Sequence, residues 1–116
     1  MEVFITGIGA VSPIGMTARE SFSAAVAGKS GITKPELFSE GITEIFAAGQ
    51  VKDFNPEPYV SKREAKRMAR FTQMAIVAAA QAWEEAGLKP EDFDPERVGV
   101  VLGSGMGGLD VVCEQY

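Results

Sequence analysis

Apolar and polar residues follow one another along the chain in a pattern that predicts strands separated by helices. Three short, β-prone apolar runs, at residues 3–5, 45–51 and 98–102, are typical of buried strands, although Gly49 weakens the second. A segment with helical character follows each of them, the last at residues 109–116. The order strand, helix, strand, helix, strand, helix predicts an α/β fold with helices packed on a sheet.

The longest helical pattern covers residues 61–87. It begins with a capping box, in which Ser61 and Glu64 each accept a hydrogen bond from the other's backbone N–H, and it ends at Gly87, which suits a left-handed position. Neither glycine nor proline interrupts it, and eight alanines between 65 and 86 favour the helix. We therefore expect one continuous helix with an exposed basic start and a buried, apolar second half at residues 74–82.

A shorter helix is predicted where Thr17 and Glu20 form a second capping box, and it should end at Gly28. We expect it to turn three apolar side chains toward the core: Phe22, Ala25 and Val26. Residues 29–44 show no clean period and are expected to form a loop. Residues 53–59, which contain two prolines, are expected to be an extended connector to the long helix.

The charge is unevenly distributed. A formal net charge of −5 argues against general nucleic-acid binding, yet five of the 11 basic residues and only one of the 16 acidic residues lie at 62–70. In a continuous helix, Arg63, Lys66, Arg67 and Arg70 would share one face near the N-terminus, where the helix dipole disfavours cations. Half or more of such clusters are simply solvated surface. The unfavourable placement nevertheless favours a binding role toward a small acidic partner.

Two glycine-rich loops are candidate dinucleotide sites. GSGMGG at 103–108 satisfies the G-x-G-x-x-G pattern, and ITGIGAVSPIG at 5–15 is similar to the glycine-rich turn of short-chain dehydrogenases. In the first loop Ser12 takes the place of the third glycine and Pro13 follows it. After the second loop, too few residues follow for the ribose-binding acid about 20 positions on. Close backbone packing explains either loop better, and we expect no cofactor.

The remaining chemistry is mostly excluded. Without histidine, the chain cannot assemble a His-based zinc site or a Ser-His or Cys-His pair, and no metal is expected. Its one cysteine, Cys113, cannot form an internal disulfide, fits a reducing compartment and is best read as an inert thiol. Because the start lacks the basic region of a signal peptide and the longest apolar run, at 74–80, is far too short to cross a bilayer, we expect a cytoplasmic protein without membrane contact.

Four stretches together resemble the N-terminal part of the β-ketoacyl-acyl-carrier-protein synthases, most closely the type II elongating enzymes: residues 4–15, 27–32, 51–83 and 98–109. The resemblance implies the thiolase fold, with α/β/α/β/α layers and a homodimer, of which residues 1–116 are part of the first half-domain, ending before the nucleophile. These acyltransferases perform a decarboxylative Claisen condensation in fatty-acid biosynthesis. Their catalytic cysteine and two histidines lie later in the chain, so no catalytic residue is expected here.

The resemblance also implies roles for six residues. Arg63, Lys66 and Arg67 match the basic residues that contact acyl carrier protein, the expected partner. Met106 matches a hydrophobic gate to the acyl pocket that is usually isoleucine, and Gly105 and Gly107 would let the backbone turn beside it. Two alternatives stay open: a non-catalytic relative similar to a chain-length factor, and a short-chain dehydrogenase fragment. Acyl-chain length and a fatty-acid or polyketide pathway also stay open.

Overall fold

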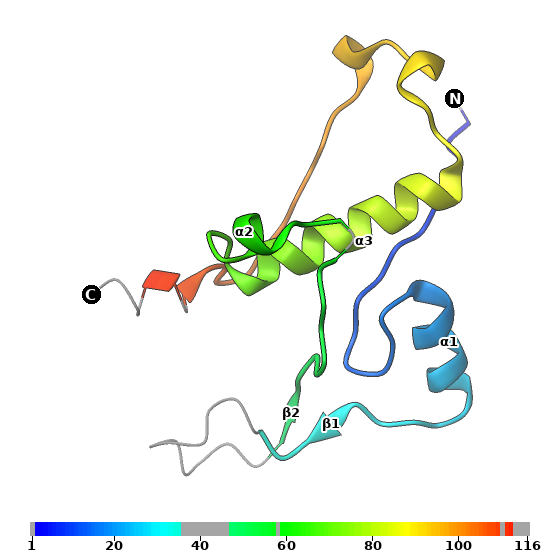
Figure 1. The fold of residues 1–116 in the computed structure, drawn as a ribbon. Helices are drawn as coiled ribbons and strands as arrows, with labels where there is room; N and C mark the ends of the chain where they lie inside the picture. Colours follow the sequence, from blue (N-terminus) through cyan, green and yellow to red (C-terminus); the bar gives the residue numbers. More distant parts are fainter. Residues whose placement is uncertain (1, 36–46, 58, 110, 113–116) are drawn as a thin grey trace.

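The computed structural model describes residues 2–35, 47–57, 59–109 and 111–112. Helix α3 (Arg70–Ala86) is the longest element, and the rest of the described chain is arranged around it (Figure 1). The other elements, in chain order, are α1 (Ala18–Val26), β1 (Ile32–Thr33), β2 (Ala48–Gly49), α2 (Lys62–Ala65) and two single 3-10 turns, η1 (Pro90–Asp92) and η2 (Pro95–Arg97). The strands pair antiparallel, with Ile32 opposite Gly49 and Thr33 opposite Ala48.

The first glycine-rich loop lies directly against α3. A Cβ atom on Gly7 would stand 2.0 Å from the carbonyl oxygen of Ala82, and one on Gly9 would stand 1.8 Å from that of Ala78. No side chain fits at such separations, so both positions require glycine. The small alanine side chains of α3 permit this approach. The prediction of close backbone packing is confirmed for these two glycines.

Two polar side chains of α3 hold this loop in place. The Gln81 amide accepts from the Ala10 N–H at 3.2 Å and donates to the Met16 carbonyl at 2.7 Å. One turn further along, the Glu85 carboxylate accepts from the Ile8 N–H. Three backbone groups of the loop thereby find hydrogen-bond partners on α3.

Helix α1 begins where predicted but turns a different face inward. The Thr17 hydroxyl accepts from the Glu20 N–H at 3.1 Å, and the Glu20 carboxylate accepts from the Met16 N–H, one residue before the predicted partner. The predicted inward face is wrong: Phe22 and Val26 are 72% and 73% exposed, and Ala25 is also exposed. The inward face instead carries Ser21, bonded to Ser12 at 2.7 Å, and the buried Ala24.

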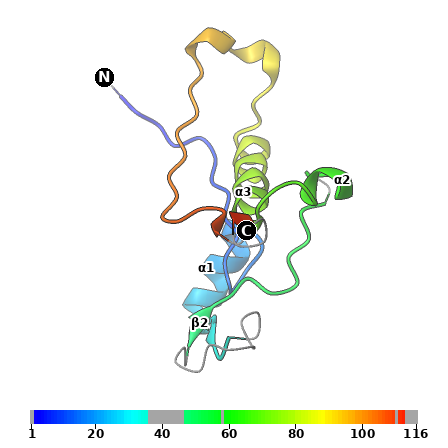
Figure 2. The same ribbon diagram turned by 90° about the vertical axis from the view of Figure 1, so that its left-hand side faces the viewer.

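The single helix predicted over residues 61–87 is divided in two. Both predicted ends are confirmed, because the Ser61–Glu64 capping box is present and Gly87 adopts a left-handed φ of 64°. Between them, α2 ends at Ala65, and Ala69 is extended (φ −58°, ψ 149°) before α3 begins. Figure 2 shows α2 standing to one side of α3. Propensity alone favoured a continuous helix, but tertiary contacts at the junction override it.

Two predicted strands are unpaired within the described part of the chain. Residues 3–5 are 75–83% exposed, and Val100 and Val101 are 91% and 100% exposed. A strand needs a neighbour for its backbone groups, and these segments have none. Of the second predicted strand only β2 forms, while residues 45 and 46 lie outside the described residues. Of the predicted α/β fold, the described residues therefore form the helices and one two-stranded antiparallel sheet.

The described hydrophobic residues form a very small core. Only Ala24, Val60 and Val77 are buried, and most of the run at 74–82, for which we expect burial inside a layered fold, is half-exposed here. The radius of gyration of 16.8 Å exceeds the roughly 13 Å of a compact 100-residue domain.

Residues 87–100 extend beyond the end of α3 and return along it (Figures 1 and 2). The Phe93 ring packs edge-on against the Trp83 ring, with 5.3 Å between the ring centres. In the described residues, no helix combines the length and apolar character needed to cross a bilayer.

Candidate functional site

The basic segment, residues 61–67, is α2 with the residues at its two ends. Its N-terminal end is closed by the capping box: the Glu64 N–H donates to Ser61 Oγ at 3.3 Å, and the Ser61 N–H donates to the Glu64 carboxylate at 3.2 Å. The Ser61 hydroxyl also donates to this carboxylate at 2.5 Å. These bonds favour the ionised form, so they lower the pKa of Glu64, the hydroxyl more than the backbone N–H.

Arg63, Lys66 and Arg67 are brought together on this segment. Helical backbone bonds continue past α2, from the Lys66 N–H to the Lys62 carbonyl at 3.4 Å and from the Arg67 N–H to the Glu64 carbonyl at 2.8 Å. Lys66 and Arg67 therefore lie about one turn after Arg63, and all three side chains are exposed. Among the described residues none of the three forms an ion pair, so all three charges face solvent.

The fourth member of the predicted basic face, Arg70, does not belong to it. Its Nη2 donates to the Val51 carbonyl at 2.6 Å, and its guanidinium lies 5.5 Å from the centre of the Phe54 ring. Arg70 is half-buried and fastens the start of α3 to the connector. No local pattern indicates this contact, because Val51 and Phe54 precede Arg70 by 16 residues or more.

The predicted gate residues lie in the loop at 103–108. Met106 is 75% exposed, and a Cβ on Gly105 would meet no atom within 4 Å. Gly107 is tightly placed, because a Cβ there would stand 2.9 Å from the Phe71 ring, and its N–H donates to Ser104 Oγ at 3.1 Å. Sequence reasoning missed two residues beside the predicted gate residues. They are Gly108, which adopts a left-handed φ of 74°, and Phe71 on α3.

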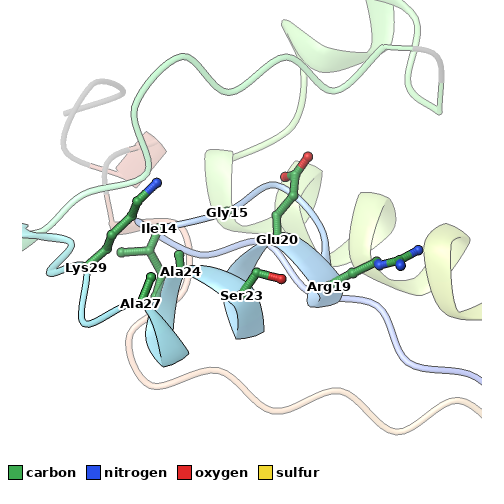
Figure 3. Close-up of a pocket in the computed structure, with 8 residues that line it drawn as sticks. All are labelled: Ile14, Gly15, Arg19, Glu20, Ser23, Ala24, Ala27 and Lys29. Atoms are coloured by element: carbon green, nitrogen blue, oxygen red, sulfur yellow. The ribbon is translucent and has the colours of Figure 1, made fainter.

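A depression on α1 was not predicted. It measures about 510 Å³ and lies open to solvent, with Arg19 and Lys29 at opposite ends and Ser23 between them (Figure 3). The Glu20 carboxylate at its rim is already engaged by the Met16 N–H at 2.8 Å. Within the described residues, no group of three potential metal ligands occurs here or elsewhere.

Tyr59, at the end of the connector, forms a hydrogen bond to the last turn of α3. The Tyr59 hydroxyl donates to the Glu84 carboxylate of α3 at 2.8 Å. Because ionised tyrosine would lose this bond and face a second negative charge, the contact raises the pKa of Tyr59. Cys113, the lone cysteine, lies outside the described residues.

Comparison with known proteins agrees with the resemblance drawn from the sequence. Residues 1–116 match the family model described as "Beta-ketoacyl synthase, N-terminal domain". The chain is 42% identical over 111 residues to 3-oxoacyl-(acyl-carrier-protein) synthase 2 of Vibrio cholerae, covering 96% of this chain and 27% of that protein. It is 44% identical over 109 residues to the protein of the same name from Staphylococcus aureus, covering 94% and 26%. The chain thus spans about a quarter of the length of these relatives. It belongs to the β-ketoacyl synthase family.

Proposed function

We propose that the chain is the N-terminal segment of a 3-oxoacyl-acyl-carrier-protein synthase, an acyltransferase that elongates acyl chains in fatty-acid biosynthesis. In this reaction, malonyl carried on acyl carrier protein loses CO₂, and the resulting carbanion attacks an enzyme-bound acyl thioester. The family match and relatives at 42–44% identity with that name support the proposal. They do not favour the chain-length-factor or dehydrogenase alternatives.

The contribution of this segment is docking of the carrier protein. The observation that carries the proposal is the basic segment, where Arg63, Lys66 and Arg67 are exposed and unpaired among the described residues of a chain with net charge −5. A local cationic surface on an acidic protein attracts a small acidic partner without attracting polyanions in general. Acyl carrier protein, named in the relatives' activity, is such a partner in this proposal.

The chemistry itself belongs to residues outside this chain. Condensation requires a nucleophile and groups that stabilise developing negative charge, and the chain contains no histidine. We assign no catalytic role to Cys113. The thiolase fold in five layers, a homodimer and a cytoplasmic location form part of the same proposal. The exposure of residues 3–5 and 98–102 supports the layered fold, because such apolar segments are typical of strands that pair within a larger sheet.

We also propose that Met106 gates the acyl pocket, with Gly105 and Gly107 allowing the backbone to turn beside it. The close contact of Gly107 with Phe71 supports this, since it leaves the loop little freedom next to α3. Methionine is unbranched and flexible, so it adapts to acyl chains of different shape more readily than isoleucine.

Charge reversal tests the docking proposal. In the full-length protein, Arg63→Glu, Lys66→Glu and Arg67→Glu together should weaken binding of acyl carrier protein about tenfold or more, roughly 1.4 kcal/mol. Three exposed pairs at about 0.2–1 kcal/mol each account for this loss. Most of it should appear in the association rate, and added salt should weaken the wild type and narrow the difference.

The matched control reverses three exposed charges elsewhere on the chain: Arg19, Lys29 and Lys34. It changes the net charge equally and should change carrier binding much less. Turnover of acyl thioesters that need no carrier should change little in either variant. Equal loss of carrier binding in both triple variants would mean that the basic segment is ordinary solvated surface.

A further inference from the structure

The interruption between α2 and α3 leaves backbone carbonyls that one side chain satisfies. In a continuous helix the Ala65 and Met68 carbonyls would accept from N–H groups four residues later. Here the Gln73 side-chain amide donates to both carbonyls, at 2.8 Å and 3.0 Å. The Ala65 carbonyl also accepts from the Met68 N–H at 3.2 Å. Gln73 stands in the second turn of α3, so its side chain reaches back across the junction to the end of α2.

Helix α2 requires stabilising contacts of this kind. It has four residues, and one turn of helix is not stable in water by itself. The Ser61–Glu64 capping box closes its N-terminal end, and Gln73 fixes its C-terminal end to α3. Figure 2 shows that α2 otherwise stands away from α3, at the side of the molecule. Arg63, Lys66 and Arg67, which form no ion pair among the described residues, lie between the capping box and Gln73.

We infer that Gln73 is a positioning residue for the carrier protein: its amide sets the direction in which the basic segment projects from α3. This inference rests on the proposed docking function. Exposed ion pairs give orientation and rate only when their charges are held in an array that matches the partner. A segment released from Gln73 keeps its net charge and still attracts an acidic protein. It then has to be ordered on binding, and that ordering weakens the complex.

The same helix provides a matched control in Gln81, eight residues further along. Its half-buried amide also makes two hydrogen bonds to backbone groups, but they belong to the loop at residues 10–16. Methionine has a similar length and helix propensity to glutamine and donates no hydrogen bond. Gln73→Met and Gln81→Met therefore remove comparable interactions from α3, and only the first releases α2.

The test measures kcat and KM for malonyl acyl carrier protein and for a carrier-free acyl-coenzyme A thioester, in the full-length protein. Gln73→Met should raise the KM for the carrier-borne substrate about three- to tenfold, because partial misalignment costs less than loss of the ion pairs. Gln81→Met should leave that KM within about twofold of the wild type. Both variants should lower the melting temperature similarly and change carrier-free turnover to the same extent.

Charge reversal of Arg63, Lys66 and Arg67, run in parallel, separates the two proposals. If reversal leaves the carrier KM unchanged, docking on this segment is wrong, and the inference about Gln73 is wrong with it. If reversal raises the KM while Gln73→Met behaves like Gln81→Met, docking stands and the positioning role is overturned. Should Gln73→Met not fold, Gln73→Asn gives the same comparison, because its amide is one methylene too short to reach both carbonyls.

Discussion

One methyl group at Gly9 tests how closely the first loop packs on α3. A Cβ at this position stands 1.8 Å from the Ala78 carbonyl oxygen and 2.9 Å from the Ala82 nitrogen, and both are backbone atoms of a long helix. Neither can move aside as a flexible side chain would. In a Gly9→Ala variant the loop must therefore retreat until the first separation grows from 1.8 Å to at least the 3.4 Å of ordinary contact.

That retreat has a predictable cost. It breaks the bond from the Ala10 N–H to Gln81, worth about 0.5–1.5 kcal/mol, and overpacking adds about 1–3 kcal/mol. Alanine also restricts the unfolded chain, which offsets about 0.4–1 kcal/mol. We expect Gly9→Ala to lose about 2 kcal/mol of unfolding free energy in urea denaturation of the full-length protein.

Two further variants separate the clash from a general effect of replacing glycine. Gly49→Ala is the control, because a Cβ there meets only the side chains of Ile32 and Pro13 at 3.3 Å, and it should cost less than about 1 kcal/mol. Gln81→Met should be less damaging in the Gly9→Ala background than in the wild type, since the Ala10 bond is already broken. Equal stability of the two alanine variants, with additive effects at Gln81, would refute the packing argument.

Three other predictions follow from single contacts. Arg70→Met should cost about 1–3 kcal/mol in urea denaturation, because the Val51 carbonyl loses its charged donor, whereas Arg19→Met on exposed α1 should cost little. The lowered pKa of Glu64 contributes stability above its ordinary value of 4.5, which is lost as the pH falls through the lowered pKa. Ser61→Ala should therefore raise that pKa in an NMR titration, and its stability deficit should narrow below pH 4.5. Met106→Ile should narrow the range of acyl lengths accepted; an unchanged product distribution would remove Met106 from the gate.

Local chain signals predicted the start of α1 and the two outer ends of the segment at 61–87. Thr17, the Ser61–Glu64 pair and Gly87 all act within four residues of the backbone groups that they satisfy, so the sequence contains the whole interaction. The close approach of the first glycine loop was also predictable, although its partner was not. Glycine indicates that something is near, and only the fold identifies it as α3.

The errors concern contacts between distant parts of the chain. The helix at 61–87 is divided where Arg70 donates to the Val51 carbonyl and Gln73 donates to the Ala65 and Met68 carbonyls. Helix propensity does not reveal either contact, because it depends only on residue type. The face of α1 was mispredicted because Ser21 bonds to Ser12, which draws Ala24 inward in place of Phe22. The apolar runs at 3–5 and 98–102 have strand character, but a strand also requires a paired neighbour.

The division of the long helix changes the argument for carrier docking. In a continuous helix, Lys66 and Arg67 would lie in the first turns, where the dipole disfavours cations, and that cost favoured a binding role. In the structure they lie at the C-terminal end of α2, where the dipole favours cations. Electrostatic cost therefore no longer distinguishes the basic segment from ordinary surface. The distinction now depends on three exposed charges without an ion-pair partner among the described residues, held between a capping box and Gln73. A fixed array of unpaired charge is what electrostatic docking requires and what solvation alone does not.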